Sequence, residues 1–346
     1  MNSERILEIK NLKVSFKTYA GIVQAVRGVD FHLDKGETLA IVGESGCGKT
    51  VTSKAIMGLL PGSQTIIEKD KSEINFDGKN LLKLSESEMS KVRGRQISMI
   101  FQDPMTSLNP TMKIGNQIAE SIIIHENVSS SEARIRALKM LELVRIPNAK
   151  ERLDQYPHEF SGGMRQRVMI AIALACNPKI LIADEPTTAL DVTIQAQIMD
   201  LINDLKKELD TGVILITHDL GVVASVADRI HVMYAGKIVE KGTTDEIFYN
   251  PKHPYTFALL KSVPKLHISE RERLYSLAGT PPDLTDPPIG CPFAARCEFG
   301  MKVCRTIYPK TANFGDEHES CCWLHNEKAD TRGVPELLLQ RGELNG

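Results

Sequence analysis

The chain has 346 residues, with 42 lysines and arginines against 44 acidic residues and a net charge of −2. This length allows one large core of roughly 200 to 250 residues plus a smaller appended region. The nearly equal numbers of basic and acidic residues exclude the basic surface that binding to duplex nucleic acid requires. The longest apolar runs, such as 168–176, are about half the roughly 18 to 20 residues of a membrane-spanning helix, and residues 1–5 lack the pattern of a secretory signal. We therefore expect a cytoplasmic protein that does not cross a membrane by itself.

The N-terminal part alternates strands, turns and one helix. The stretches 7–16 and 28–33 alternate apolar and polar residues and end in the turn sequence 34–37, which predicts two strands of an antiparallel flank. Residues 38–42 are apolar throughout, so they predict a buried strand, and a glycine-rich loop then leads into a helix over about 50–60. The order strand, loop and helix is typical of a nucleotide-binding α/β fold.

The glycine-rich loop matches the pattern G-x-x-x-x-G-K-[ST]. Its glycines let backbone N–H groups curl round the phosphates of a nucleotide, and the following helix adds the positive end of its dipole. Lys49 is expected to reach the β- and γ-phosphates and Thr50 to offer its hydroxyl to Mg²⁺, while Cys47 occupies a variable position. The predicted phosphate site consists of Gly43, Ser45, Gly46, Cys47, Gly48, Lys49, Thr50 and Val51.

The region from about 105 to 168 has helical rather than strand periodicity. Apolar residues recur at helical spacing in 114–124 and 131–144. Ser130 or Ser131 precedes an acidic first turn, which predicts an N-cap at one of the two positions. We therefore expect a helical subdomain here, ending in a helix over 163–176.

Two buried strands are predicted next, and each ends in residues with chemical potential. Residues 180–183 run into Asp184 and Glu185, and residues 213–216 run into Thr217 and His218. Ligands of open α/β sheets bind at the carboxyl ends of the strands. This placement favours a functional site over an ordinary capping pair or a surface turn.

The segment 160–167, F-S-G-G-M-R-Q-R, lies between the phosphate loop and the acidic pair. In this order the three motifs resemble the ATPase subunits of ATP-binding cassette (ABC) transporters, and the resemblance covers about residues 6–250. It implies an α/β P-loop ATPase core with a mostly parallel sheet, an antiparallel β flank and a helical subdomain, in an ABC domain over 1–250. One departure is Met164, where the family commonly has glutamine.

The resemblance also implies roles for residues outside the phosphate loop. Gln102 would touch Mg²⁺ and the attacking water, Asp184 would be the Walker B aspartate, and Glu185 would be the catalytic base of ATP hydrolysis. His218 would be the switch histidine at the γ-phosphate, and Asp191 would belong to the loop that couples paired sites.

A last group of implied residues binds ATP from other directions. Tyr19 would stack on the adenine, with Phe16 as the less favoured candidate. A second phosphate clamp would close over the ATP of a partner subunit, so that hydrolysis requires a dimer. This clamp consists of Ser161, Gly162 and Gly163.

Two further segments resemble the ATPase subunits of oligopeptide and dipeptide importers, a subgroup that includes nickel importers. They are 103–110, and 250–256 running on to 262–264, where a proline-led start also predicts a helix near 255–261. The resemblance implies an energy-coupling subunit at the cytoplasmic face of the membrane. Its partners would be a sister ATPase or a second copy of the chain, two membrane permeases and, indirectly, an extracytoplasmic peptide-binding protein.

Two alternatives to peptide import remain open at this stage. Nickel uptake by the same subgroup is one, because substrate contacts belong to the permeases and the binding protein. A soluble cassette protein of DNA repair or translation is the less favoured one, since the chain has a single signature segment, no sustained heptads and no basic face.

The tail of the chain, within the extension 251–346, has a different composition. Five prolines between 279 and 292 predict a loop or extended arm there, and five of the seven cysteines follow in 291–322. Disulfides are disfavoured in a reducing cytoplasm and zinc sites usually have tighter cysteine pairs, so a [4Fe-4S] cluster is favoured over zinc and over free thiols. We thus predict a small irregular Cys-rich domain. Its ligands would be Cys291, Cys297, Cys304 and Cys322, the last preferred to Cys321 because the Cys-Trp-Leu end resembles the tail of that subgroup.

Overall fold

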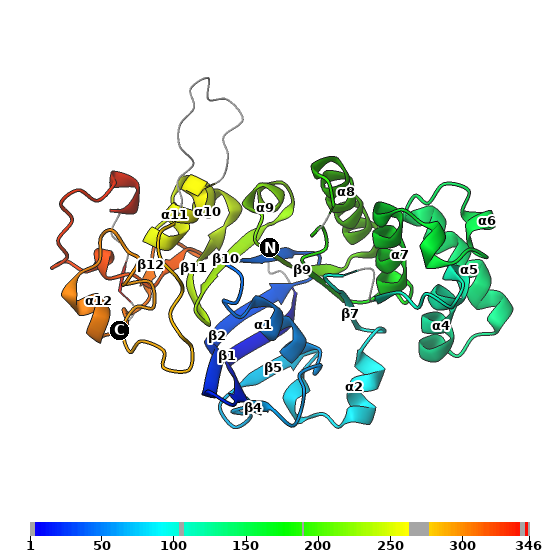
Figure 1. Ribbon diagram of the computed structural model, residues 1–346, viewed down its shortest axis with the longest axis horizontal. Coiled ribbons are helices and arrows are strands. Elements are labelled where there is room, and N and C mark those ends of the chain that lie inside the picture. The colour runs from blue at the N-terminus through cyan, green and yellow to red at the C-terminus, as the bar shows by residue number, and fades with distance from the viewer. Residues whose placement is uncertain (1–3, 104–106, 189, 263–276, 340–342, 345–346) are drawn as a thin grey trace, which may run out of the picture.

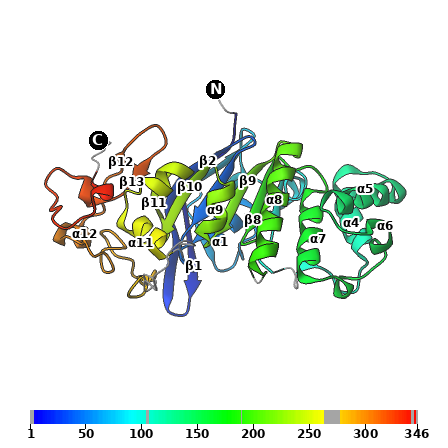
Figure 2. The same cartoon turned by 90° about the horizontal axis from the view of Figure 1, so that it is seen from above.

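The computed structural model describes residues 4–103, 107–188, 190–262, 277–339 and 343–344. The molecule is elongated, with a helical region at one end, a sheet-rich centre, and the C-terminal extension at the opposite end (Figure 1; Figure 2). Parts of three predicted motifs, residues 104–106, 189 and 263–264, lie outside the described residues.

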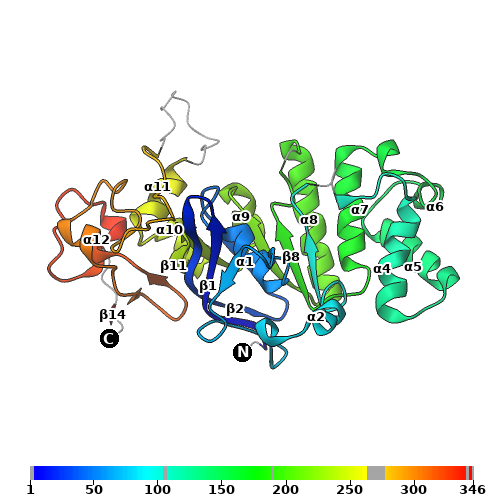
Figure 3. The ribbon, with the colours of Figure 1, turned by 60° about the horizontal axis from the view of Figure 1, so that its bottom comes forward.

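The N-terminal residues form an antiparallel sheet, as the alternating pattern predicts. The two strands of the flank are longer than expected, and a short turn at residues 19–20 joins them. The hydrogen-bonded order is β2-β1-β5-β6, with β4 also paired to β1, and Figure 3 shows β1 and β2 beside the helix α1. The strands are β1 (Arg5–Thr18), β2 (Gly21–Asp34), β4 (Thr65–Ile67), β5 (Glu73–Phe76) and β6 (Lys79–Asn80).

A second sheet carries the core of the molecule. Its order is β14-β12-β13-β11-β10-β3-β9-β8-β7, and the five strands from β10 to β7 are parallel. Every residue of these five strands is buried, which is typical of parallel strands covered on both faces. They are β3 (Thr38–Val42), β7 (Ile97–Ile100), β8 (Ile180–Asp184), β9 (Gly212–Thr217) and β10 (Arg229–Tyr234).

The C-terminal extension continues this sheet instead of forming a separate body. The strand β11 (Lys237–Thr243) pairs with β10 on one side and with β13 (Glu319–Ser320) on the other. The strands β12 (Ala312–Asn313) and β14 (Glu343–Leu344) complete the edge. The expected Cys-rich domain is therefore joined to the ATPase core through backbone hydrogen bonds, and the proposed boundary at residue 250 crosses a continuous structure.

Helices occupy the described part of the region predicted to be helical, and two helix ends in the molecule differ from the predictions. The N-cap of α5 is Ser129, whose side chain accepts a hydrogen bond from the N–H of Glu132 at 3.3 Å, and not Ser130 or Ser131. The helix after the phosphate loop, α1, ends at Ile56, because Gly58 has a φ of 61°. The helices of this region and of the first half are α1 (Lys49–Ile56), α2 (Glu86–Val92), α4 (Ile114–Glu126), α5 (Ser130–Leu143), α6 (Ala149–Arg152) and α7 (Gly162–Leu174).

Helices of the second half follow the predicted strands and extend into the tail. The proline-led helix is α11, and the described residues 279–292 contain neither helix nor strand, as the prolines predict. None of the helices in the described ranges has the length and apolar character needed to span a membrane. These helices are α8 (Val192–Leu209), α9 (Leu220–Val226), α10 (Thr244–Tyr249), α11 (Pro254–Ser262) and α12 (Lys302–Thr306).

A buried carboxylate fastens the extension to the sheet. Glu240 on β11 is 1% exposed, and it accepts hydrogen bonds from the N–H groups of Lys252 at 2.6 Å and His253 at 2.9 Å. The Nε2 atom of His318, in the extension, lies 2.9 Å from the same carboxylate. One side chain thus ties β11, the start of α11 and the strand β13 together, since His318 directly precedes β13.

Candidate ATP-binding site

The phosphate loop joins β3 to α1 and is shaped by close backbone contacts. Gly43 has a φ of 153°, and a Cβ atom there would lie 2.1 Å from the carbonyl oxygen of Met233. Gly48 has a φ of 109°, and its Cβ would lie 2.5 Å from the carbonyl oxygen of Ala25. Glycine is thus required at both positions, and the loop curls tightly above the N-terminus of α1, where backbone N–H groups can receive an anion.

The loop lysine is held inside this curl. Lys49 is 4% exposed, and its Nζ donates to the carbonyl oxygens of Gly43 at 2.8 Å and Glu44 at 3.0 Å. These carbonyls satisfy the ammonium group where a phosphate would otherwise bind. The Cys47 side chain is buried beneath the loop, and burial raises the pKa of this thiol. Cys47 is thus the one residue of the predicted phosphate site that does not line the cavity described below.

The end of β8 meets the start of α1. The hydroxyl of Thr50, which is expected to bind Mg²⁺, donates to Oδ1 of Asp184, the predicted Walker B aspartate, at 3.0 Å. Burial raises the pKa of Asp184, while the hydrogen bond from Thr50 acts in the opposite direction. A divalent cation beside this pair would stabilise the charged carboxylate, so the donor set fits the ion.

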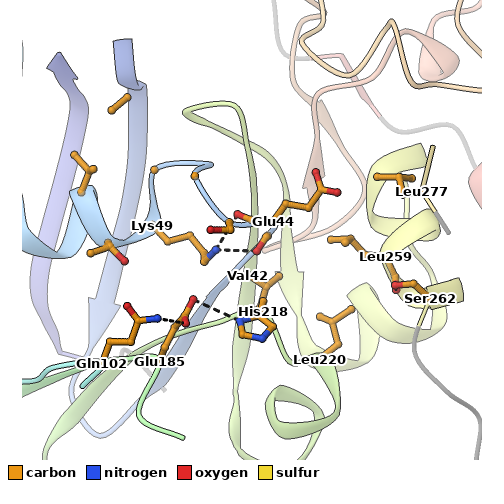
Figure 4. Close-up of a pocket in the computed structure, with 17 residues that line it drawn as sticks. Val42, Glu44, Lys49, Gln102, Glu185, His218, Leu220, Leu259, Ser262 and Leu277 are labelled. Carbon is orange, nitrogen blue, oxygen red and sulfur yellow. Dashed lines mark hydrogen bonds and ion pairs between the residues drawn. The ribbon is translucent and has the colours of Figure 1, made fainter. Parts of the chain in front are cut away.

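The predicted catalytic residues converge on Glu185 (Figure 4). The Nε2 atom of Gln102 donates to Oε2 of Glu185 at 2.7 Å, and Thr188 donates to the same oxygen at 3.1 Å. Nδ1 of His218 lies 3.4 Å from Oε1 of Glu185. Glu185 itself has a φ of 49°, an uncommon backbone conformation for this residue type, and its N–H is held by the carbonyl of Ile216 at 2.8 Å. The neighbouring parallel strands β7, β8 and β9 therefore bring together three residues that are far apart in the sequence.

A single cavity of about 810 Å³ connects these groups, and its size is within the range of small-ligand sites. Most of the predicted phosphate loop lines it, together with the three predicted catalytic residues. Asp184 lies behind Thr50 and does not line the cavity. The lining includes Gly43, Ser45, Gly46, Gly48, Lys49, Thr50, Val51, Gln102, Glu185 and His218.

The signature residues lie elsewhere, at the facing ends of α7 and α8. Ser161 is the N-cap of α7, with its side chain 3.4 Å from the N–H of Met164, and Asp191 is the N-cap of α8. Gly163 faces Ile194 of α8, where a Cβ would come within 3.0 Å of a methyl carbon. Ser161, Gly162, Gly163 and Asp191 are all absent from the lining of the chain's own cavity.

The aromatic candidates for the adenine also lie outside the cavity lining. Tyr19 stands at the turn between β1 and β2 with its side chain fully exposed. Phe16 is half-buried and packs against the core of the N-terminal sheet. The described structure does not bring Tyr19 to the phosphate loop, and its stacking role stays a prediction.

Comparison with known proteins identifies the family. Residues 26–188 match the profile of the ABC transporter family, and residues 239–304 match the profile described as the oligopeptide/dipeptide transporter C-terminal region. The chain is 60% identical, over 96% of its length and 93% of the relative, to the oligopeptide transport ATP-binding protein OppD of Bacillus subtilis. It is 58% identical, over 94% of its length and 97% of the relative, to the dipeptide transport ATP-binding protein DppD of the same organism.

The chain belongs to the ATP-binding subunits of oligopeptide and dipeptide ABC transporters. Solved structures agree with the fold of this ABC transporter ATPase. It is similar to the ATP-binding cassette MJ0796, solved as a dimer in a post-hydrolysis state with ADP and phosphate, with a TM-score of 0.61, 29% identity, and coverage of 69% of this chain and 99% of that one.

The five cysteines in the tail of this ABC transporter ATPase fall into two environments. The four predicted ligands line one small cavity next to the aromatic ring of Phe293. Burial raises the pKa of Cys291 to about 12 and that of Cys297 to about 11, and it also raises the pKa of Cys322 well above its ordinary value. Within the described ranges, no group of three or more His, Cys, Asp or Glu side chains is arranged to hold a metal ion. The iron–sulfur cluster thus stays a prediction. The four residues are Cys291, Cys297, Cys304 and Cys322.

The remaining tail cysteine faces another part of the molecule. Cys321 lies in a separate cavity lined by Lys237 and Tyr308, and its sulfur is 3.5 Å from the hydroxyl of Thr311. The structure thereby separates Cys321 from the four predicted ligands.

Two residues of the site are not predicted from the sequence. Thr188 holds the carboxylate of Glu185, and its position three residues after Glu185 in a tight turn is a local signal that could have predicted it. Glu44 lines the cavity and contacts the C-terminal extension. No local pattern in the sequence predicts that contact, because its two partners are 252 residues apart.

Proposed function

We propose that this ABC transporter ATPase hydrolyses ATP to drive the import of dipeptides or oligopeptides through a membrane complex. The observation that carries the proposal is the cavity lined by Lys49, Thr50 and the hydrogen-bonded Glu185, with Asp184 hydrogen-bonded to Thr50. Relatives named as oligopeptide and dipeptide transport ATP-binding proteins supply the substrate class. The C-terminal match to the oligopeptide/dipeptide profile favours peptides over nickel.

The proposed chemistry is phosphoryl transfer to water, which depends on positioning and charge neutralisation. Lys49 turns from the carbonyls of the loop to the phosphates of ATP. Glu185 accepts a proton from the attacking water, Gln102 and Thr188 keep its carboxylate in place, and His218 contacts the γ-phosphate. Thr50 and Gln102 would hold Mg²⁺, with Asp184 hydrogen-bonded to Thr50, and the ion would supply further charge neutralisation.

The proposed active unit is a dimer of ATPase subunits, either with a sister subunit or with a second copy of the chain. Ser161, Gly162 and Gly163 do not line the cavity of their own chain, which fits a role on the ATP of a partner. The neighbouring Asp191 would couple the two sites. The similar cassette MJ0796 was solved as a dimer, which supports the same arrangement here.

The proposed location is the cytoplasmic face of the membrane, where the subunit would bind two permeases. An extracytoplasmic binding protein would deliver the peptide. We also propose residues 1–250 as the ABC domain, with the helical subdomain at about 105–168, and residues 251–346 as an extension that remains hydrogen-bonded to the core sheet.

The test is uptake into proteoliposomes that contain the subunit, its sister ATPase and the permeases, with the binding protein supplied outside. ATP-dependent uptake of a labelled dipeptide or oligopeptide is the expected result. Uptake of nickel that peptides do not inhibit would contradict the substrate class. ATP hydrolysis without any association with permeases, but with ribosomes or DNA, would contradict the transport function itself.

For the cysteines, we propose a [4Fe-4S] cluster held by Cys291, Cys297, Cys304 and Cys322, with zinc as the alternative. The support is that these four thiols line one cavity while Cys321 lies in another. The test is the iron and zinc content of anaerobically purified protein. About four irons per chain are expected. Cys322→Ser should lose them and the matched Cys321→Ser should keep them. One zinc or no metal would contradict the cluster.

A further inference from the structure

Arg296 of the C-terminal extension forms an ion pair with Glu44 of the phosphate loop. Arg296 donates from Nη1 to one carboxylate oxygen of Glu44 at 2.6 Å and from Nη2 to the other at 2.9 Å. The side chain of Arg296 is 4% exposed and that of Glu44 is 28% exposed. Two parallel hydrogen bonds in such a sheltered place make a directional, strong contact.

The guanidinium group of Arg296 is itself held in place before any nucleotide binds. Its Nε donates to the carbonyl oxygen of Ala278 at 3.0 Å, and Nη1 lies 3.2 Å from the hydroxyl of Tyr234. The backbone N–H of Arg296 donates to the carbonyl of Phe293 at 2.9 Å, and the ring of Phe293 packs edge-on against Tyr234. The extension therefore presents a fixed positive charge to the phosphate loop.

The backbone of Glu44 is held as firmly as its side chain. Its N–H donates to the hydroxyl of the fully buried Tyr255 at 2.9 Å, and its carbonyl accepts from Lys49. Figure 4 shows the Glu44 carboxylate pointing away from Lys49. When Lys49 turns to the phosphates, the contacts from Arg296 and Tyr255 remain to keep the loop in shape.

The charge of Glu44 makes this contact necessary. Glu44 lines the ATP cavity, so an uncompensated carboxylate in the loop would repel the phosphates of ATP. We propose that Arg296 is a positioning residue of the ATP site, which orients Glu44 and neutralises its charge so that the phosphate loop accepts ATP. This inference rests on the ATP binding of the proposed function and assigns part of it to the C-terminal extension.

The experiment compares Arg296→Met, Glu44→Gln and the double variant in the assembled complex. ATP affinity is measured by fluorescence of a labelled ATP analogue, and KM and kcat are measured by phosphate release. We expect Arg296→Met to raise KM about tenfold with little change in kcat, because it leaves a negative charge unpaired beside the phosphates. Glu44→Gln removes that charge, so the double variant should return KM to within about threefold of the wild type. The matched control is Arg332→Met, an exposed arginine of the same extension that pairs only with Asp330 among the described contacts, and it should leave KM unchanged.

Two results would overturn the inference. One is an unchanged KM in Arg296→Met, and the other is a double variant as impaired as Arg296→Met, which would show that Arg296 acts through the fold and not through the charge of Glu44. If Arg296→Met does not fold, Arg296→Lys replaces it, because a lysine keeps the charge but loses the paired geometry. Its expected KM is about threefold raised, and an unchanged KM would again overturn the inference. A wild-type complex that binds ATP without hydrolysing it would count against the proposed function alone, since the affinity series still tests Arg296.

Discussion

The ATP cavity is predicted from sequence motifs and the cysteine cavity from the cysteine content of the tail, and the two predictions differ in how well they place side chains. In the ATP cavity, Gln102 after β7 and Glu185 after β8 meet within hydrogen-bond distance, because parallel strands end at a common edge of the sheet. In the cysteine cavity, the four predicted ligands share one space, yet no metal-holding arrangement exists among the described residues. In helices and strands, the sequence spacing of two residues predicts their relative positions. In a tail with few helices and strands, the spacing does not predict the distances between side chains.

The largest expected effect lies at Glu185, the proposed catalytic base. Glu185→Gln should lower kcat for ATP hydrolysis about 10³-fold, because the amide cannot accept the proton of the attacking water. Equilibrium ATP binding should stay within a few-fold of the wild type. Normal turnover by this variant would show that the convergence of Gln102 and His218 on Glu185 serves the fold instead of the chemistry.

The junction between the two regions should depend on Glu240. Glu240→Ala leaves the buried N–H groups of Lys252 and His253 without their acceptor, so we expect it to lower the free energy of unfolding by about 3 kcal/mol. Chemical denaturation measures this loss. The matched control is Lys241→Ala on the same strand, whose ion pair with Glu319 is partly exposed, and it should cost less than about 1 kcal/mol. Equal losses in the two variants would refute a special role for Glu240.

Acid should weaken the extension before it weakens the ATP cavity. Burial lowers the pKa of His253 to about 3 and that of His325 to about 4. The unfolded chain therefore binds protons that the folded chain refuses, so stability is present above about pH 6.5 and falls as pH drops towards these values. At pH 5 each histidine should cost about 2 kcal/mol. Hydrogen exchange at pH 5 and 7 should show earlier opening at residues 253 and 325 than in β8, and uniform opening would contradict this.

A smaller effect on thermal stability is expected at Asp184, whose buried charge serves the function but lowers the stability of the protein. Burial raises the pKa of Asp184, so at neutral pH the charged carboxylate destabilises the nucleotide-free protein. Asp184→Asn should raise its melting temperature by about 2 °C while weakening Mg²⁺-dependent hydrolysis. A lower melting temperature would mean that the hydrogen bond from Thr50 outweighs the cost of burial.

The sequence predicts the core of the site and most of the regular elements, because these depend on local patterns. The glycines of the phosphate loop, the buried strand before Asp184 and the strand before His218 are all visible at short range. The N-cap at Ser129 differs by one position from the prediction, since three serines in a row offer the same hydrogen bond.

Contacts between distant segments could not be predicted in this way. The two-residue strands β12 and β13 are too short to show any periodicity, and they form only because β11 offers an open edge. The grip of Arg296 on Glu44 joins a turn in the tail to the phosphate loop, and no spacing rule links them. Both features need the folded chain. The strands tie the cysteine-bearing extension to the core sheet, and Arg296 ties it to the ATP cavity.

The most direct test of the central claim is a structure of the Glu185→Gln variant in its ATPase dimer with Mg²⁺ and ATP. We predict that the γ-phosphate lies among Lys49, Gln102 and His218 of one subunit. If the partner is a second copy of this chain, its residues 161–163 close over the γ-phosphate. If the partner is a sister ATPase, its matching segment does so. ATP bound away from Glu185, or enclosed without any signature segment from a partner, would contradict the account.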